Sequence, residues 1–531
     1  MLTARELTFL SVFVACALTM PHRGQAQATP YVPLESSHYA DVDALVAVGL
    51  VKTVIAGQRP YSRLMFARLA IEARSNLDRR TDATPSRRFL EAVKRLEDAY
   101  SLEPRVGATL RSLSSDATLA SSPARSVRSS YDTDDPNGRI DALVNPLLQR
   151  NRGRRLADGG TLAAEAQLDL ILGTRLAGQL RPRAWVSDDG EGSQVTLVGG
   201  YLRGLLGNLS IEAGRNHSSH GHGSDAGLIL SSNARGLDMI RFSLDRPARL
   251  PGLLHGLGPV LVSARLADLG GTSDTPHSKL VVFELSLRPH PNLELGTTLL
   301  NHQGGRGAPP ATLLQRLQDL LLIYPQGEEI SDKVIGADLR WTLPAVQAQV
   351  YVEVFTTDDH EFFKDASEAL GSEAVWVIGA KRFGLGSAGR FDIWVEGKKA
   401  GVRPHTHHQF TSGLTLDGRV IGDPLGPLAT ALATGMDWRG PFTTVSISGA
   451  WERYSGDVYD DIRRDGRFAW DKIADLPDEV RKRVVGTWTS DTGERGLTKV
   501  VRIGVEAVER FAFSNERRTN FLAQLLLGYR W

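Results

Sequence analysis

The chain has almost no cysteine, no long apolar run after its first residues, and no excess of charge of either sign. Its single cysteine, Cys16, lies in the N-terminal apolar stretch, so the rest of the chain has neither a disulfide framework nor a thiol metal site. After that stretch no run reaches the roughly 18 apolar residues of a transmembrane helix. Lysine and arginine (62) nearly balance aspartate and glutamate (61), so the charge gives no indication of a nucleic-acid partner. The 53 glycines are consistent with many turns and strand bends.

Residues 521–531 alternate strictly between two faces. Phe521, Leu525, Tyr529 and Trp531 share one face, because successive side chains of a strand point to opposite sides. That face is wholly apolar and ends in two aromatics. In a soluble β-sandwich, which is the alternative, it would be an edge strand prone to aggregation. In a closed barrel within a bilayer it is a lipid-facing strand with an aromatic girdle, and a last strand ending in Trp or Phe resembles that of bacterial outer-membrane proteins. The pattern favours the membrane barrel.

Residues 1–28 have the order of a secretory signal peptide. Arg5 precedes an apolar run over residues 7–20, and small residues around Ala28 suit signal peptidase. A lipoprotein signal acylated at Cys16 is the weaker alternative, because the usual leucine three residues before it is absent. The sequence therefore predicts an exported protein.

Residues 29–105 have a helical period and predict a small periplasmic helical domain. Apolar residues such as Tyr39, Val42 and Leu45 recur at three- and four-residue spacing, and Ser62 is a candidate N-cap for a second helix. A third helix is expected over residues 86–100. One apolar stripe per helix makes a poor core alone, so the domain is expected to lean on the barrel.

Residues 159–531 have a period of two and predict a large antiparallel transmembrane β-barrel. Mid-strand acids and arginines must face the lumen, since a charge on the lipid face costs about 2–4 kcal/mol. About 16–18 such segments are present, enough for an aqueous interior. Residues 106–158 are interpreted as a connector with a possible first strand. Residues 311–324, with a possible helix, and 457–484 look too polar or too helical for strands and are interpreted as long loops at the mouth.

Four segments resemble the Wzi family of capsule-assembly outer-membrane proteins, in order over nearly the whole mature chain. Each consists of short motifs, and the family's usual Trp-Gly-Pro-Gly turn is replaced here by a His-rich, Gly-rich stretch that keeps the glycines. The segments are Tyr31-Val32-Pro33-Leu34 with Arg59-Pro60-Tyr61-Ser62, Gly214-Arg215 with Asn233-Ala234, residues 335–341 leading to 350–353, and residues 407–413 continuing through 418–426. The resemblance implies a barrel of about 18 strands with a small periplasmic helical domain, acting as a lectin that attaches capsular polysaccharide to the cell surface.

Sugar binding calls for aromatic faces surrounded by carboxylate, amide and guanidinium groups. Residues of these types lie on the expected lumen face, and two more lie in the family-like motif. The lumenal charges are equally consistent with pairing across the barrel, and the two motif residues with ordering a loop. The candidates are Arg183, Asp338, Arg340, Tyr351, Glu353 and Trp394 in the lumen, with Arg215 and Asn233 in the motif.

Two histidine clusters, at residues 217–222 and 405–408, lie in Gly- and Ser-rich surroundings that suggest mobile loops rather than a supported zinc site. No Gly-x-Ser-x-Gly motif supports a hydrolase, and lumenal acids are too numerous to single out a glycosidase pair. We expect a non-enzyme without cofactor or metal. The alternatives are a sugar-selective or general porin, and a barrel tethered to the cell wall by an S-layer-homology-like helical domain.

The expected location is the bacterial outer membrane. The expected partners are capsular or extracellular polysaccharide, outer-membrane lipid and the barrel assembly machinery, with no nucleic acid and a monomeric state. Which polysaccharide is bound is not readable from the residues.

Overall fold

The computed structural model describes residues 27–531 apart from 81–85, 103–105, 122–123, 129–138, 155, 157, 189–192, 225–226, 321–329, 358–365, 406–409, 411, 465–466 and 493–495. The predicted signal peptide therefore lies almost entirely outside the described residues, as do His407 and His408. Within the described part, no helix has the length and apolar character needed to cross a bilayer.

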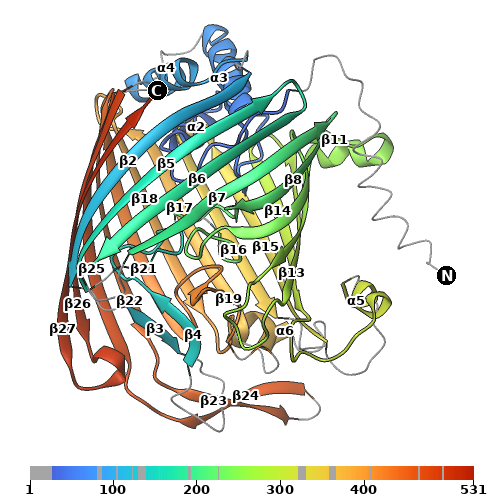
Figure 1. Cartoon of the computed structure of the whole chain (residues 1–531), viewed down its shortest axis with the longest axis vertical. Helices are drawn as coiled ribbons and strands as arrows, with labels where there is room; N and C mark the ends of the chain where they lie inside the picture. Colours follow the sequence, from blue (N-terminus) through green and yellow to red (C-terminus); the bar gives the residue numbers. More distant parts are fainter. Residues whose placement is uncertain are drawn as a thin grey trace.

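The chain forms a closed antiparallel barrel of 18 strands, as the alternating pattern predicted. Figure 1 shows the tilted wall with the N-terminal helices gathered at one end. The first strand pairs with both the second and the last, which closes the wall. The strands are β2 (Gly107–Ser121), β5 (Gly159–Leu172), β6 (Leu176–Ser187), β7 (Ser193–Leu206), β8 (Leu209–Asn216), β10 (Leu237–Leu244) continued by β11 (Ala248–Arg249), β12 (Pro259–Asp268), β13 (Lys279–His290), β14 (Leu293–Gln303), β15 (Ser331–Leu343), β16 (Ala348–Thr357), β17 (Val375–Leu385), β18 (Phe391–Ala400), β21 (Ala429–Arg439), β22 (Thr443–Tyr454), β25 (Glu479–Asp491), β26 (Gly496–Glu509) and β27 (Arg517–Arg530).

The period of two separates the two surfaces of the wall. On β27, Phe521, Leu525 and Tyr529 are exposed on the outer face while Asn520 and Leu522 are buried inward. Outward aromatics gather at the rim that carries the helices, and they form a girdle there. They are Trp341, Phe391, Trp488, Tyr529 and Trp531.

The wall begins with β2, inside the stretch interpreted as a connector with a possible first strand. Its apolar residues, such as Leu113 and Leu119, alternate outward, while Asp116 and Thr118 turn toward the lumen. Half of a lumen-lined strand is polar by necessity, so its composition resembles that of a linker.

One loop interpretation was wrong. Residues 457–484 contain β23 (Val458–Arg464) and β24 (Arg467–Ala474), which pair as an antiparallel hairpin, and the wall strand β25 starts at Glu479. The hairpin stands beyond the rim opposite the helices (Figure 1). A ribbon outside the bilayer has no lipid-facing side, so a polar composition does not exclude strands. The possible helix near residue 312 is confirmed as α5 (Leu313–Leu320).

The helical domain is confirmed as α2 (His38–Ala47), α3 (Arg63–Asp78) and α4 (Arg87–Ala99). Ser62 caps α3 as predicted, since its hydroxyl accepts a hydrogen bond from the Met65 N–H at 3.2 Å. The apolar faces form one core that also includes Phe383 of the barrel wall. The domain thus leans on the barrel and covers its helix-bearing end (Figure 1).

A buried ion-pair network fixes this contact. Arg88 of α4 donates to Asp41 of α2 at 2.7 Å and to Asp392 of β18 at 3.1 Å. Arg95 donates two more hydrogen bonds to Asp41. Burial alone would raise the pKa of Asp41, but Arg88 and Arg95 outweigh it and hold that pKa well below its ordinary value. Docking of the helices is therefore charge-matched as well as apolar.

Candidate functional site

The polypeptide before α2 runs along the inner wall. The Tyr31 N–H donates to the Tyr201 hydroxyl at 2.7 Å, and the Tyr31 ring lies under two guanidinium groups, 4.4 Å from Arg203 and 4.7 Å from Arg241. Cation–π contacts of this kind gain strength when they are buried, as these are. The segment therefore ties the helical domain into the barrel.

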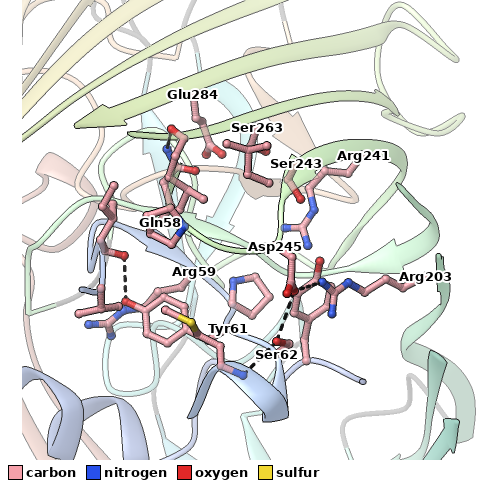
Figure 2. Close-up of a pocket in the computed structure, with 18 of the residues that line it drawn as sticks. Gln58, Arg59, Tyr61, Ser62, Arg203, Arg241, Ser243, Asp245, Ser263 and Glu284 are labelled. Carbon is pink, nitrogen blue, oxygen red and sulfur yellow. Dashed lines mark hydrogen bonds and ion pairs between the residues drawn. The ribbon is translucent and has the colours of Figure 1, made fainter. Parts of the chain in front are cut away.

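A small cavity lies where this segment, the start of α3 and the wall meet. Figure 2 shows Asp245 facing both Ser62 and Arg203, with Arg241, Ser243, Ser263 and Glu284 farther along the wall. Its volume is about 50 Å³, which suits ordered water. A sugar ring does not fit there, so we assign this cavity to the packing of the domain.

The middle of the lumen is filled by residues 217–223, which enter from between β8 and β10. Gln58–Arg59 (β1) of the helical domain pairs with Ser219–His220 (β9) of this segment. The segment is buried, so the expectation of a mobile histidine loop was wrong. At Gly221 a Cβ would lie 2.5 Å from Glu353 Oε2, so glycine is required for the close approach. The Gly-rich pattern therefore reflects close packing of the backbone rather than a mobile loop.

Two predicted site residues contact this segment directly, and two more lie beside them. Asp338 of β15 accepts contacts from His220 Nε2 at 2.7 Å and His222 Nε2 at 2.8 Å. Glu353 of β16 accepts the Gly223 N–H at 2.6 Å and also the N–H groups of His222 and Leu228.

Arg340 and Tyr351 complete the group. Arg340 donates to Glu294 at 2.6 Å, and Glu294 also accepts the Gly57 N–H at 2.7 Å. The Tyr351 hydroxyl donates to Glu396 at 2.7 Å. These side chains therefore help to hold inserted segments inside the lumen. This agrees with the alternative that the lumenal charges pair within the barrel rather than bind sugar.

The other candidates lie apart from this cluster. Arg183 donates to Glu165 at 2.8 and 3.0 Å in a buried group that also contains Arg181. Trp394 is half-buried on the lumen side of β18 and lies against Gly435, where a Cβ would come within 2.5 Å of its indole nitrogen.

The two motif residues lie toward the rim opposite the helical domain, which we call the open rim. The Asn233 side chain is buried and donates to the Val420 carbonyl at 2.9 Å. Arg215 pairs with Asp238 through two 2.7 Å hydrogen bonds, and both side chains keep solvent access. Arg235 and Asp417 extend this partly exposed cluster. Of the eight candidates, Arg215 lies in the most accessible polar setting.

Sequence reasoning missed the carboxylates that partner these groups, above all Glu165, Glu294 and Glu396. Each occupies a lumen-facing position of a strand, so the alternation marked it as inward. No local sequence signal distinguishes a carboxylate that accepts hydrogen bonds from an inserted segment from other lumen-facing carboxylates. Over the described residues, no group of three or more His, Cys, Asp and Glu is placed to hold a metal ion.

Two further segments lie in the lumen toward the rim opposite the helical domain. They are the described residues of 139–158 and of 401–428. Asp423 N–H donates to the Leu228 carbonyl at 2.8 Å, and Leu143 N–H donates to the Gly418 carbonyl at 2.9 Å. At the other end, the Gly221 N–H donates to the Gly57 carbonyl at 2.8 Å. Backbone contacts therefore run from the helical domain through the lumen to the opposite rim.

These features define a class: an 18-stranded outer-membrane β-barrel whose lumen is filled by its own chain. The sequence profile of the family described as capsule assembly protein Wzi matches residues 140–439. The chain belongs to this family, as the sequence motifs predicted.

A solved structure of this family has the same fold. Wzi of Escherichia coli, an outer-membrane carbohydrate-binding β-barrel involved in group 1 capsule assembly, is 14% identical and superposes with a TM-score of 0.67 over 94% of this chain and 99% of that chain. OprD of Pseudomonas aeruginosa is 9% identical, with a TM-score of 0.43 over 81% of this chain and 97% of that chain. Among curated protein sequences, none matches the chain significantly.

Proposed function

We propose that this protein is a non-catalytic, lectin-like barrel that attaches capsular or extracellular polysaccharide to the cell surface. The observation that carries the proposal is the filled lumen. Separate segments of the chain meet inside the wall through backbone hydrogen bonds, from Gly57 at one end to Gly418 near the other. Membership of the capsule-assembly family and the similarity to carbohydrate-binding Wzi of Escherichia coli support the same reading.

The filled lumen argues against the porin alternative. A porin needs a continuous aqueous path, whereas here Asp338, Glu353 and Glu294 are each engaged by histidine, guanidinium or backbone N–H donors. Polymer binding is therefore assigned to the open rim, where Arg215 and its neighbours keep access to solvent.

The cell-wall tether alternative also loses support. The residues that resemble an S-layer-homology repeat, such as Tyr39 and Leu45, are buried in the core that the helices share with the barrel. This favours a plug over a free wall-binding module. We further propose a monomer that reaches the outer membrane through the barrel assembly machinery.

Binding is tested with the purified full-length protein on an array of bacterial surface polysaccharides. We expect the wild-type protein to bind the polysaccharide of the cell that produces it. Binding should be weaker in Arg215→Ala. It should be unchanged in Arg74→Ala, because Arg74 belongs to an exposed ion pair in the helical domain. Absence of binding to every polymer would contradict the proposal.

Planar-bilayer conductance is the complementary test. The proposal predicts no steady ion current from the wild-type barrel. Large, steady currents would favour a porin.

A further inference from the structure

The strongest unassigned site is a groove at the open rim, away from the Arg215 cluster. It lies between the end of β22, the start of β25 and the turn that joins β26 to β27, and its volume is about 390 Å³. Ligand pockets in proteins start at roughly 300 Å³, so a sugar residue fits this space. We call it the mouth groove. It is lined by Ala124, Arg125, Ser126, Pro427, Tyr454, Ser455, Leu476, Pro477, Glu479, Arg481 and residues 511–513.

The turn over Phe511–Phe513 is held in an uncommon shape. Arg510, Ala512 and Phe513 all have positive φ angles, of 58°, 50° and 62°. Residues other than glycine adopt this region at a cost, so something must hold them there. The Ala512 N–H donates to Glu479 Oε2 at 2.6 Å, which fixes the turn against β25. The arrangement brings Phe511 and Phe513 to the same groove.

The polar floor is buried and incompletely satisfied. Arg481 is 1% exposed and donates to Glu479 at 2.7 Å and to Glu506 at 3.0 Å. Among the described residues, Arg481 Nη2 and Glu506 Oε1 have no hydrogen-bond partner. Of these two residues only Arg481 lines the groove, so its Nη2 donor is the open group that faces a ligand. Buried polar atoms without partners are uncommon and call for an explanation, such as a ligand or bound water.

The cations of the groove already have partners. Arg481 is ion-paired with both Glu479 and Glu506. Arg125 is already engaged, since it donates to the carbonyls of Pro424 and Leu425 and lies 4.1 Å from the Tyr454 ring centroid. Arg518 lies 4.0 Å from the Phe511 ring centroid and is paired with Glu516 at 2.6 Å. Because each of these cations already has a partner, the groove suits an uncharged ligand with hydroxyl groups.

We propose that the mouth groove is a subsite for a neutral hexopyranose unit of the bound polysaccharide. A hydroxyl oxygen accepts hydrogen bonds and therefore matches the open Nη2 donor of Arg481. The apolar face of the ring meets the aromatic wall of Phe511 and Phe513. Many such weak contacts along one polymer add up to firm attachment. This inference rests on the proposed function and specifies where, and to which sugar class, the polymer binds.

The test uses the full-length protein in detergent and the immobilised surface polysaccharide of the producing cell. Phe511→Ala removes one aromatic wall, and Ala124→Trp fills the groove without removing a polar group. Loss of one stacked ring is expected to weaken binding about tenfold. Phe442→Ala is the matched control, because Phe442 is exposed in the turn before β22 at the opposite rim. Heat-modifiable gel mobility confirms that each variant is folded.

Reducing the polymer's carboxyl groups to alcohols tests the sugar class. We expect the ratio between wild-type and Phe511→Ala affinities to stay the same on the reduced polymer. A ratio that collapses to one after reduction would show that the groove binds an acidic sugar and would overturn the assignment.

The outcomes separate the two proposals. If wild-type protein binds the polymer and both groove variants bind equally well, the groove assignment fails while the proposed function stands. If wild-type protein binds no polymer, the proposed function fails as well.

Discussion

The helical domain and the barrel lumen are both filled by buried side chains, but of opposite chemistry. The domain buries aliphatic and aromatic side chains such as Phe66, Phe89 and Leu96 in one apolar core. The lumen buries arginines, histidines and acids, including Arg203, Asp338 and Glu353. A helix satisfies its own backbone, so its packing face can be apolar. The segments inserted into the lumen have irregular backbone that needs partners.

The lumenal carboxylates supply those partners. Glu294 accepts the N–H groups of Ala56 and Gly57, and Glu353 accepts those of residues 222, 223 and 228. Wall side chains alone do not fill a barrel of this width, so the chain itself enters. The polar side chains of the lumen therefore bind the inserted segments of the chain. This explains how the interior of a wide barrel is filled.

The largest expected effect is in the helical core. Phe66→Ala removes a fully buried ring that packs against Tyr39 and Tyr100, and we expect a loss of about 3–5 kcal/mol in the stability of the domain. Limited proteolysis of the folded barrel measures it, with faster cleavage of the helices. Ile71→Ala, on the exposed face of α3, is the control. Equal cleavage of both variants would contradict an apolar core.

The matching change in the lumen is Asp338→Asn. It keeps the shape but removes the charge that contacts His220 and His222. Hydrogen bonds to charged groups contribute about 1.5–3 kcal/mol each, so residues 217–223 should loosen while the helical core stays intact. Hydrogen exchange resolves the two regions. Unchanged protection of residues 217–223 would rule out Asp338 as their anchor.

A smaller effect is expected at the helix start that faces the cavity of Figure 2. Ser62→Ala removes the cap of α3 and should lower the stability of the domain by about 1 kcal/mol. Ser86 precedes α4 without a side-chain cap bond, so Ser86→Ala should be neutral by the same thermal unfolding assay. A loss at Ser86 as large as that at Ser62 would argue against capping.

The smallest effect near neutral pH concerns the docking network. The pKa of Asp41 is lower in the folded domain than in the unfolded chain, so its carboxylate stabilises the fold above about pH 4, and this contribution is lost as the pH falls further. We expect flat protection of the helices from about pH 8 to pH 5 and increasing cleavage by an acid-tolerant protease below about pH 4. Asp41→Asn should flatten that acid dependence. An unaltered profile would show that Asp41 is not the group whose protonation loosens the helices.

The parts of the fold that depend on local periodicity were predictable. The alternation over residues 521–531, the cap at Ser62 and the helices each follow from neighbours in the sequence. The hairpin β23–β24 was missed because strand pairing outside the bilayer leaves no apolar stripe. The grouping of Asp338 with His220 depends on a contact between distant segments that no local pattern specifies.

Attachment itself is tested most directly by measuring where the polysaccharide is found in cells that lack this protein. The account predicts that synthesis continues at the normal level, that intact polymer appears in the medium, and that wild-type protein restores retention. Cells without the protein that keep all of their polysaccharide at the surface would contradict it.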